Sequence, residues 1–227
     1  MKSFADHYDQ IRNYEIEIQQ FSYLTRTTHT PVKLGEVYNT SIWLFESKTP
    51  KGVLITSGWQ GDEPAGWQAS KILCQSLPTV SFIPFVSPIC FLNRQHKNYQ
   101  GKNIDRGWPE AETSEGKILQ NNISDIVRLG ELCFISLQED RNRFIPYFYG
   151  WNQTVELDEM IQRKITEHFP LAKESNFGSK EGLFCEHAVR NGCKMAVQLE
   201  TPADGSYTLS KRVDCQVDTV KSLMGLI

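Results

Sequence analysis

Two glutamines and two glutamates stand just after or at the end of apolar runs in this sequence, where side chains could do chemistry. Gln60 and Glu63 lie three residues apart in the segment SGWQGDEPAG, residues 57–66. Gln138 and Glu200 come at the ends of two further apolar runs. In open α/β sheets, ligands bind beyond the carboxyl ends of the strands, so we expect these four side chains to converge.

Their chemistry is that of oxygen donors and of a general base. Amide and carboxylate oxygens suit hard cations such as magnesium, calcium or manganese, whereas imidazole suits zinc. A carboxylate at a strand end can also accept a proton during a reaction. More ordinary interpretations exist: Glu63, directly before Pro64, can stabilise a helix N-terminus, and Glu200 can be a solvated turn acid.

Four segments, in the family's own order, resemble the M14 metallocarboxypeptidases, including the bacterial branches close to succinylglutamate desuccinylase and aspartoacylase. The segments are residues 57–66, residues 87–109 with GKNIDRGWP at their end, residues 134–140 (FISLQED) and residues 197–202 (VQLETP). The resemblance covers residues 35–225, most of the chain.

The resemblance implies zinc as cofactor and a metal site made of Gln60, Glu63 and Gln138, with glutamine at both positions where the family carries histidine. Histidine, glutamate and histidine form a known catalytic zinc set with an open fourth position. Amides are weaker donors for zinc. Three outcomes stay open: an altered site that still binds metal, recruitment of another ligand such as His96 or His187, and no metal at all.

The resemblance also implies catalytic and substrate-binding residues. Glu200 would be the general base, and Arg106 would polarise the scissile carbonyl or hold a substrate carboxylate. Asp105 stands where the family has asparagine, and His96 where it has arginine; both changes remove affinity for an anionic terminus. We therefore expect a substrate other than an ordinary C-terminal peptide. Asn98, in the same segment, is a further expected substrate-binding residue.

The aromatic segment RFIPYFYGWN, residues 143–152, has two interpretations. It is either a packed cover or a substrate lid, and in a lid Tyr147 or Tyr149 would donate a hydroxyl to the substrate.

Composition sets limits on partners. Of 227 residues, 40% are hydrophobic and 22% charged, which is typical of a globular domain with a sizeable core. The formal net charge of −3 gives no reason to expect nucleic acid or a membrane as partner. The six cysteines form no Cys-x-x-Cys pair, and we expect reduced, packed thiols. Acids at the N-terminus do not fit a signal peptide, so we expect a cytoplasmic protein.

Apolar periodicity predicts the elements that position these residues. Helical spacing of Phe4, Tyr8, Ile11, Tyr14 and Ile18 predicts an amphipathic helix over residues 3–24, and alternation around Asn39 predicts a hairpin over residues 32–46. Strands are expected at residues 52–56, 80–88, 131–137 and 194–200; helices at residues 64–73, 115–129, 156–168 and 209–224; loops at residues 98–116 and 139–155.

Alternating strands and helices indicate a mixed α/β sheet, and the resemblance implies a three-layer α/β/α fold with a mostly parallel central sheet. We expect one domain over residues 1–227, with the helix and hairpin of residues 1–48 packed on it. The expected function is hydrolysis of an amide bond in a small peptide or acylated amino acid through metal-activated water. The alternative is an inactive homologue that binds a peptide or small molecule in the same pocket.

Overall fold

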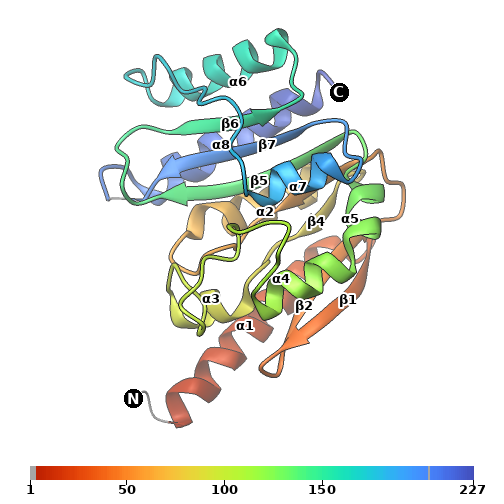
Figure 1. The fold of residues 1–227 in the computed structure, drawn as a ribbon. Helices are drawn as coiled ribbons and strands as arrows, with labels where there is room; N and C mark the ends of the chain where they lie inside the picture. Colours follow the sequence, from red (N-terminus) through yellow and green to blue (C-terminus); the bar gives the residue numbers. More distant parts are fainter. Residues whose placement is uncertain (1–3, 204) are drawn as a thin grey trace.

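A computed structural model describes residues 4–203 and 205–227, which form a mixed sheet between two layers of helices (Figure 1). The strands are β1 (His29–Val37), β2 (Thr40–Ser47), β3 (Val53–Thr56), β4 (Ser81–Ile83), β5 (Cys133–Asp140), β6 (Tyr147–Trp151) and β7 (Ala196–Pro202). They lie in the order β1-β2-β4-β3-β5-β7-β6. The neighbours among β4, β3, β5 and β7 are parallel, whereas β1, β2 and β6 are antiparallel to their neighbours. The predicted fold class is confirmed.

Helices cover both faces of the sheet because successive residues of the buried strands point to opposite faces and are apolar on both faces. On β5, Ile135 and Leu137 face one apolar cluster and Phe134 faces the other. The first cluster includes side chains of α1 (Phe4–Thr25), α2 (Pro64–Ser76), α6 (Val155–His168) and α8 (Leu209–Met224). The second includes side chains of α4 (Ser114–Asn121), α5 (Ile123–Leu129) and α7 (Phe184–Arg190). A short α3 (Pro88–Asn93) packs beside α1.

Most predicted elements are present. The helix expected over residues 3–24 is α1, although Ser3 and the side chains of Phe4 and Tyr8 lie outside the described residues. The expected hairpin is β1 and β2, joined by Tyr38 and Asn39 with φ of 47° and 63°. Positive φ at both central residues is the backbone of a tight hairpin turn.

Several parts of the prediction were wrong. The strand expected at residues 80–88 ends at Ile83, because Pro88 begins α3 and Ser87 caps it by accepting from the Cys90 N–H at 3.2 Å. Residues 115–129 form two helices that meet at Asn122. The predicted loop at residues 139–155 contains β6. α7 was not predicted at all.

The cysteines are buried and unpaired, as predicted. No helix in the described part of the chain is long and apolar enough to cross a membrane.

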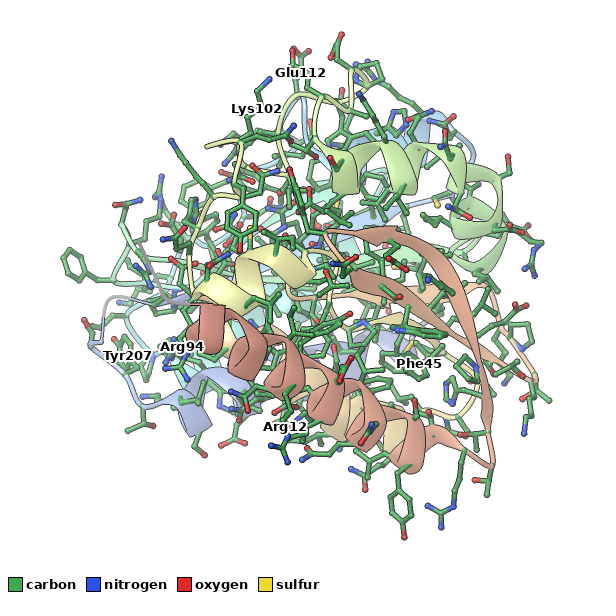
Figure 2. The ribbon with its side chains drawn as sticks, turned by 90° about the horizontal axis from the view of Figure 1, so that it is seen from below. Arg12, Phe45, Arg94, Lys102, Glu112 and Tyr207 are labelled. Atoms are coloured by element: carbon green, nitrogen blue, oxygen red, sulfur yellow. The ribbon has the colours of Figure 1, made fainter. Side chains whose placement is uncertain are left out.

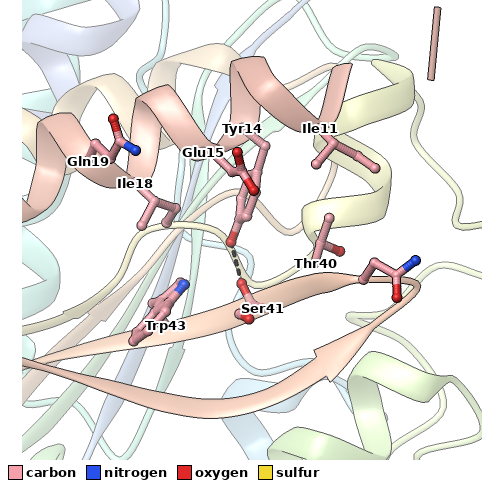
Figure 3. A pocket seen from close by; sticks show the side chains of 9 residues that line it. Ile11, Tyr14, Glu15, Ile18, Gln19, Thr40, Ser41 and Trp43 are labelled. Carbon is pink, nitrogen blue, oxygen red and sulfur yellow. Dashed lines mark hydrogen bonds between the residues drawn. The ribbon is translucent and has the colours of Figure 1, made fainter. Parts of the chain in front are cut away.

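Aromatic side chains pack α1 against the hairpin. The rings of Phe21 and Phe45 lie 4.6 Å apart. The Tyr14 hydroxyl donates to the Ser41 carbonyl oxygen at 2.5 Å, across a groove of about 340 Å³ between α1 and β2 (Figure 3). Arg12 points outward from the helix (Figure 2). The helix therefore covers the sheet through one apolar stripe.

Phe45→Ala should destabilise the protein by about 3–5 kcal/mol, because it removes a fully buried ring between α1 and the sheet. Denaturant unfolding followed by circular dichroism measures the change. Phe144→Ala is the matched control: Phe144 is 70% exposed, so its loss should change stability by less than about 0.5 kcal/mol. Similar effects of the two substitutions would contradict this packing.

Candidate functional site

The loop between β3 and α2 carries Gln60, Asp62 and Glu63 and is fixed by a glycine. A Cβ on Gly61 would lie 1.6 Å from the carbonyl oxygen of Cys90 in α3. No other residue type leaves room for the chain to pass there. The glycine therefore holds the loop against α3 and sets where the neighbouring acids lie.

The structure brings the loop acids beside the ends of β5 and β7. Gln138 and Glu200 are opposite each other in the register of these strands. Burial, and then the nearby charge of Glu200, raise the pKa of Glu63 well above its ordinary value. Gln60, Glu63, Gln138 and Glu200 are all buried. Glu63, Gln138 and Glu200 are thus buried near one another at the carboxyl ends of the parallel strands.

Gln138 is engaged with its neighbours through its amide nitrogen. Its Nε2 donates to Asp105 Oδ2 at 3.0 Å and to Ser136 Oγ at 2.9 Å. The other Asp105 oxygen accepts from the Phe184 N–H, at the start of α7, at 3.4 Å. Asp105 is buried, and its two oxygens link Gln138 to the start of α7 through hydrogen bonds.

Several buried oxygens in the loop have no hydrogen-bond partner among the described residues. They are Gln60 Oε1, Asp62 Oδ1 and both carboxylate oxygens of Glu63. Buried polar atoms normally have partners, so these oxygens are available to a hydrogen-bond donor or a cation. The donor types do not reproduce the His-Glu-His zinc set, but the unpaired oxygens together with a nearby imidazole, His96, fit a divalent cation.

Glu200 has the environment of a proton-transfer group. Its Oε1 accepts from Gln198 Nε2 at 2.8 Å. Burial raises its pKa to about 8, and the positive charge of Arg106 opposes this shift. Burial likewise raises the pKa of Asp105 to about 6. Arg106 itself is exposed at the rim, so it is accessible to a ligand.

A cavity of about 880 Å³ opens beside Asp62. Gly61, Arg94 and Arg141 are among its lining residues; Arg94 is labelled in Figure 2. Arg141 Nε lies 3.0 Å from Asp62 Oδ2, which partly neutralises this acid. The cavity gives the acidic loop a route to solvent.

Asn98 is used within its own loop. Its Oδ1 accepts from the Gln100 and Lys102 N–H groups at 3.0 and 3.2 Å, and its Nδ2 donates to the buried Glu115 at 3.2 Å. Lys102 also pairs with Glu112 on the surface (Figure 2). These bonds account for the shape of the loop; contact of Asn98 with a substrate stays a prediction.

The aromatic segment divides into a packed strand and an exposed tip. Tyr147 lies opposite Glu200 in the register of β6 and β7, and its hydroxyl donates to Asp140 Oδ2 at 2.7 Å. The Tyr149 hydroxyl lies 3.5 Å from Lys180 Nζ. Phe144 and Ile145 are exposed. The strand half is packed on the sheet, and donation of a hydroxyl from Tyr147 or Tyr149 to a substrate stays a prediction.

The two candidate recruited histidines differ in position. His187 is stacked on Trp108 and lies 2.7 Å from Gln120 Oε1, so its ring is engaged on α7. His96 Nδ1 lies 3.9 Å from both Asp62 Oδ1 and Glu63 Oε1. Only the second histidine therefore faces the loop acids.

Sequence reasoning missed four supporting side chains. Glu139 accepts from the Ala65 N–H at 2.7 Å and pairs with Arg212, which ties α2 and α8 to β5. Gln216 Nε2 donates to the Gln138 carbonyl oxygen at 2.9 Å. Gln198 supports Glu200 from the same face of β7, and its spacing of two residues could have revealed it.

Gly61→Ala should destabilise the protein by about 3 kcal/mol and displace the acidic loop, because the added Cβ meets backbone rather than a flexible side chain. Denaturant unfolding measures the loss. Gly225→Ala, at the end of α8 with its closest contact at 3.3 Å, is the control and should change stability little. A fully stable Gly61→Ala protein would contradict the described loop path.

The buried acids should make the metal-free protein less stable as pH rises. Burial raises the pKa of Glu139 to about 7 and that of Glu200 to about 8, from 4.5. Each group holds its proton more tightly when folded, so its stabilisation is complete below the unfolded pKa and is lost as pH rises through the folded pKa.

We therefore expect the Tm of the metal-free protein to fall by several degrees between about pH 5 and about pH 9, and Glu200→Gln to reduce the fall. Differential scanning calorimetry across this pH range measures the Tm of both proteins. A Tm that rises with pH, or an unchanged slope in the variant, would count against the buried, proton-holding Glu200.

Comparisons with known proteins complete the description of the site. No family model matches the sequence, and no curated protein matches it. Solved structures do: a presumed metallopeptidase from Shewanella denitrificans has a TM-score of 0.84 at 21% identity, over 95% of this chain and 90% of that chain. A metallo-carboxypeptidase from Burkholderia cenocepacia has a TM-score of 0.69 at 17% identity, over 90% of this chain and 66% of that chain.

A succinylglutamate desuccinylase from Silicibacter has a TM-score of 0.61 at 14% identity, over 88% of this chain and 65% of that chain. At these identities the likeness concerns the path of the chain and not its chemistry. The protein has the fold of these metallopeptidase-like and carboxypeptidase-like structures.

Proposed function

We propose that the protein is a metallopeptidase-like hydrolase that cleaves an amide bond in a small peptide or an acylated amino acid. The observation that carries this proposal is Glu63: a buried carboxylate with both oxygens unpaired, placed beside Glu200 at the carboxyl edge of a carboxypeptidase-like sheet. Perturbed acids in such a position are typical of functional sites.

Glu63 would hold a divalent cation. When bound, such an ion lowers the pKa of a coordinated water and polarises a carbonyl group. Its positive charge would also favour the ionised form of Glu200, which otherwise holds its proton near neutral pH because burial raises its pKa to about 8.

Glu200 would then work as general base and acid. It accepts a proton from the attacking water as the water oxygen bonds to the carbonyl carbon, and returns the proton to the nitrogen as the C–N bond breaks. Gln198 steadies one oxygen of this carboxylate, which orients the side chain. Arg106, which is exposed, would stabilise the developing oxyanion.

The acid at position 105 supports a substrate without a free C-terminal carboxylate. Asp105 offers no side-chain N–H, whereas the asparagine that the resemblance places there would. A neutral or cationic substrate end is therefore the better match to this part of the pocket.

The test is release of amine from a panel of N-acylated amino acids and short peptides, with added Zn²⁺ or Mn²⁺, followed by mass spectrometry. We expect Glu200→Gln to lower kcat by at least about 100-fold while metal binding is retained. Glu112→Gln, an exposed acid paired with Lys102, is the control and should keep full activity.

Absence of hydrolysis for the whole panel with metal bound would favour the second candidate, a binding protein. The two glutamines at positions 60 and 138 favour that candidate, because amide oxygens bind zinc more weakly than imidazole does. Calorimetric binding of panel members without turnover would support it.

A further inference from the structure

Asp62, Glu63 and His96 form a compact group of possible ligands at the edge of the pocket. One ligand atom from each lies within 4.8 Å of the others, and His96 Nδ1 is 3.9 Å from an oxygen of each acid. Ligand atoms about 2.1 Å from one ion lie roughly 3–4 Å apart. Small side-chain adjustments would therefore bring these atoms around a single ion.

The unpaired oxygens are independent evidence for a ligand here. Glu63 is 2% exposed, and neither of its oxygens has a hydrogen-bond partner among the described residues. Asp62 uses Oδ2 for Arg141, while its buried Oδ1 has no hydrogen-bond partner and faces His96. Of the four oxygens of these two adjacent acids only Asp62 Oδ2 has a partner, so the pair is costly to bury unless a cation lies between them.

The position implied by the resemblance is less suited to the ion. It relies on the amide oxygens of Gln60 and Gln138, which are weaker donors for zinc than imidazole. The imidazole of His96 instead lies 3.9 Å from an oxygen of Asp62 and from an oxygen of Glu63. The stronger donor set thus lies on the β3–α2 loop and at His96.

We propose that Asp62, Glu63 and His96 bind a divalent transition-metal ion, at a site shifted from Gln138 toward the β3–α2 loop. One imidazole and two carboxylates suit Zn²⁺ or Mn²⁺ better than Mg²⁺ or Ca²⁺, which prefer oxygen donors only. This inference rests on the proposed function and deepens it, since it names the ligands of the metal-dependent hydrolase.

The geometry also gives the ion an entry path. Asp62 lines the cavity of about 880 Å³, and the His96 side chain is 45% exposed. Arg141 contacts Asp62 from an exposed position, so it can move away when a cation replaces its charge.

The test is titration of the full-length, metal-free protein with Zn²⁺ and with Mn²⁺ by calorimetry. We expect one ion per chain, at least about 100-fold weaker binding in His96→Ala and in Asp62→Asn, and unchanged binding in Gln138→Ala. His168→Ala is the matched histidine control: it pairs with Asp218 far along the chain and should bind normally.

Electron spin-echo modulation of the Mn²⁺ complex provides a readout that does not depend on activity. A coordinated imidazole nitrogen should be seen in the wild type and in His168→Ala and be lost in His96→Ala. His96→Asn repeats the test with a smaller change, and thermal unfolding verifies that each variant is folded.

Equal weakening by Gln138→Ala and His96→Ala, normal binding by His96→Ala, or no binding by the wild type at millimolar metal would each overturn the shifted site. The hydrolase proposal fails separately: metal bound through His96 without cleavage of any amide would leave the site standing and remove the reaction.

Discussion

Several buried carboxylates lie close together at the carboxyl ends of the parallel strands, and few positively charged side chains lie beside them. Glu63, Asp105 and Glu200 are each almost fully removed from water. The arginines nearby, Arg106 and Arg141, lie at the exposed rim. In a low dielectric such acids either keep their protons or find a cation. The raised pKa values of the buried acids correspond to carboxyl groups that keep their protons. The unpaired oxygens of the β3–α2 loop favour a bound cation.

The sheet and its helices hold this unfavourable arrangement in place. Parallel strands direct Gln138 and Glu200 to the same edge, and Gly61 lets the acidic loop pass tightly under α3. Two side chains of α8 bind the end of β5: Gln216 donates to the Gln138 carbonyl oxygen, and Arg212 pairs with Glu139. A site assembled from distant segments therefore rests on a rigid frame, as functional sites require.

Much of the frame could be predicted from the sequence, because strongly apolar runs and helical spacing fix the type of an element. β6 was not predicted, because residues 139–155 are rich in polar as well as aromatic residues and so resembled a loop. Positions after the strands, together with the family resemblance, singled out Gln60, Glu63, Gln138 and Glu200. The partner of each side chain could not be predicted, since the bond from Gln138 to Asp105 and the approach of His96 to Asp62 depend on tertiary packing.

A crystal of the protein soaked in MnCl₂, with anomalous diffraction recorded on the manganese edge, would locate the ion directly. The shifted site predicts one strong anomalous peak in contact with Asp62, Glu63 and His96, and none against Gln138. A peak between Gln60, Glu63 and Gln138, or no peak near Glu63 at saturating metal, would contradict it.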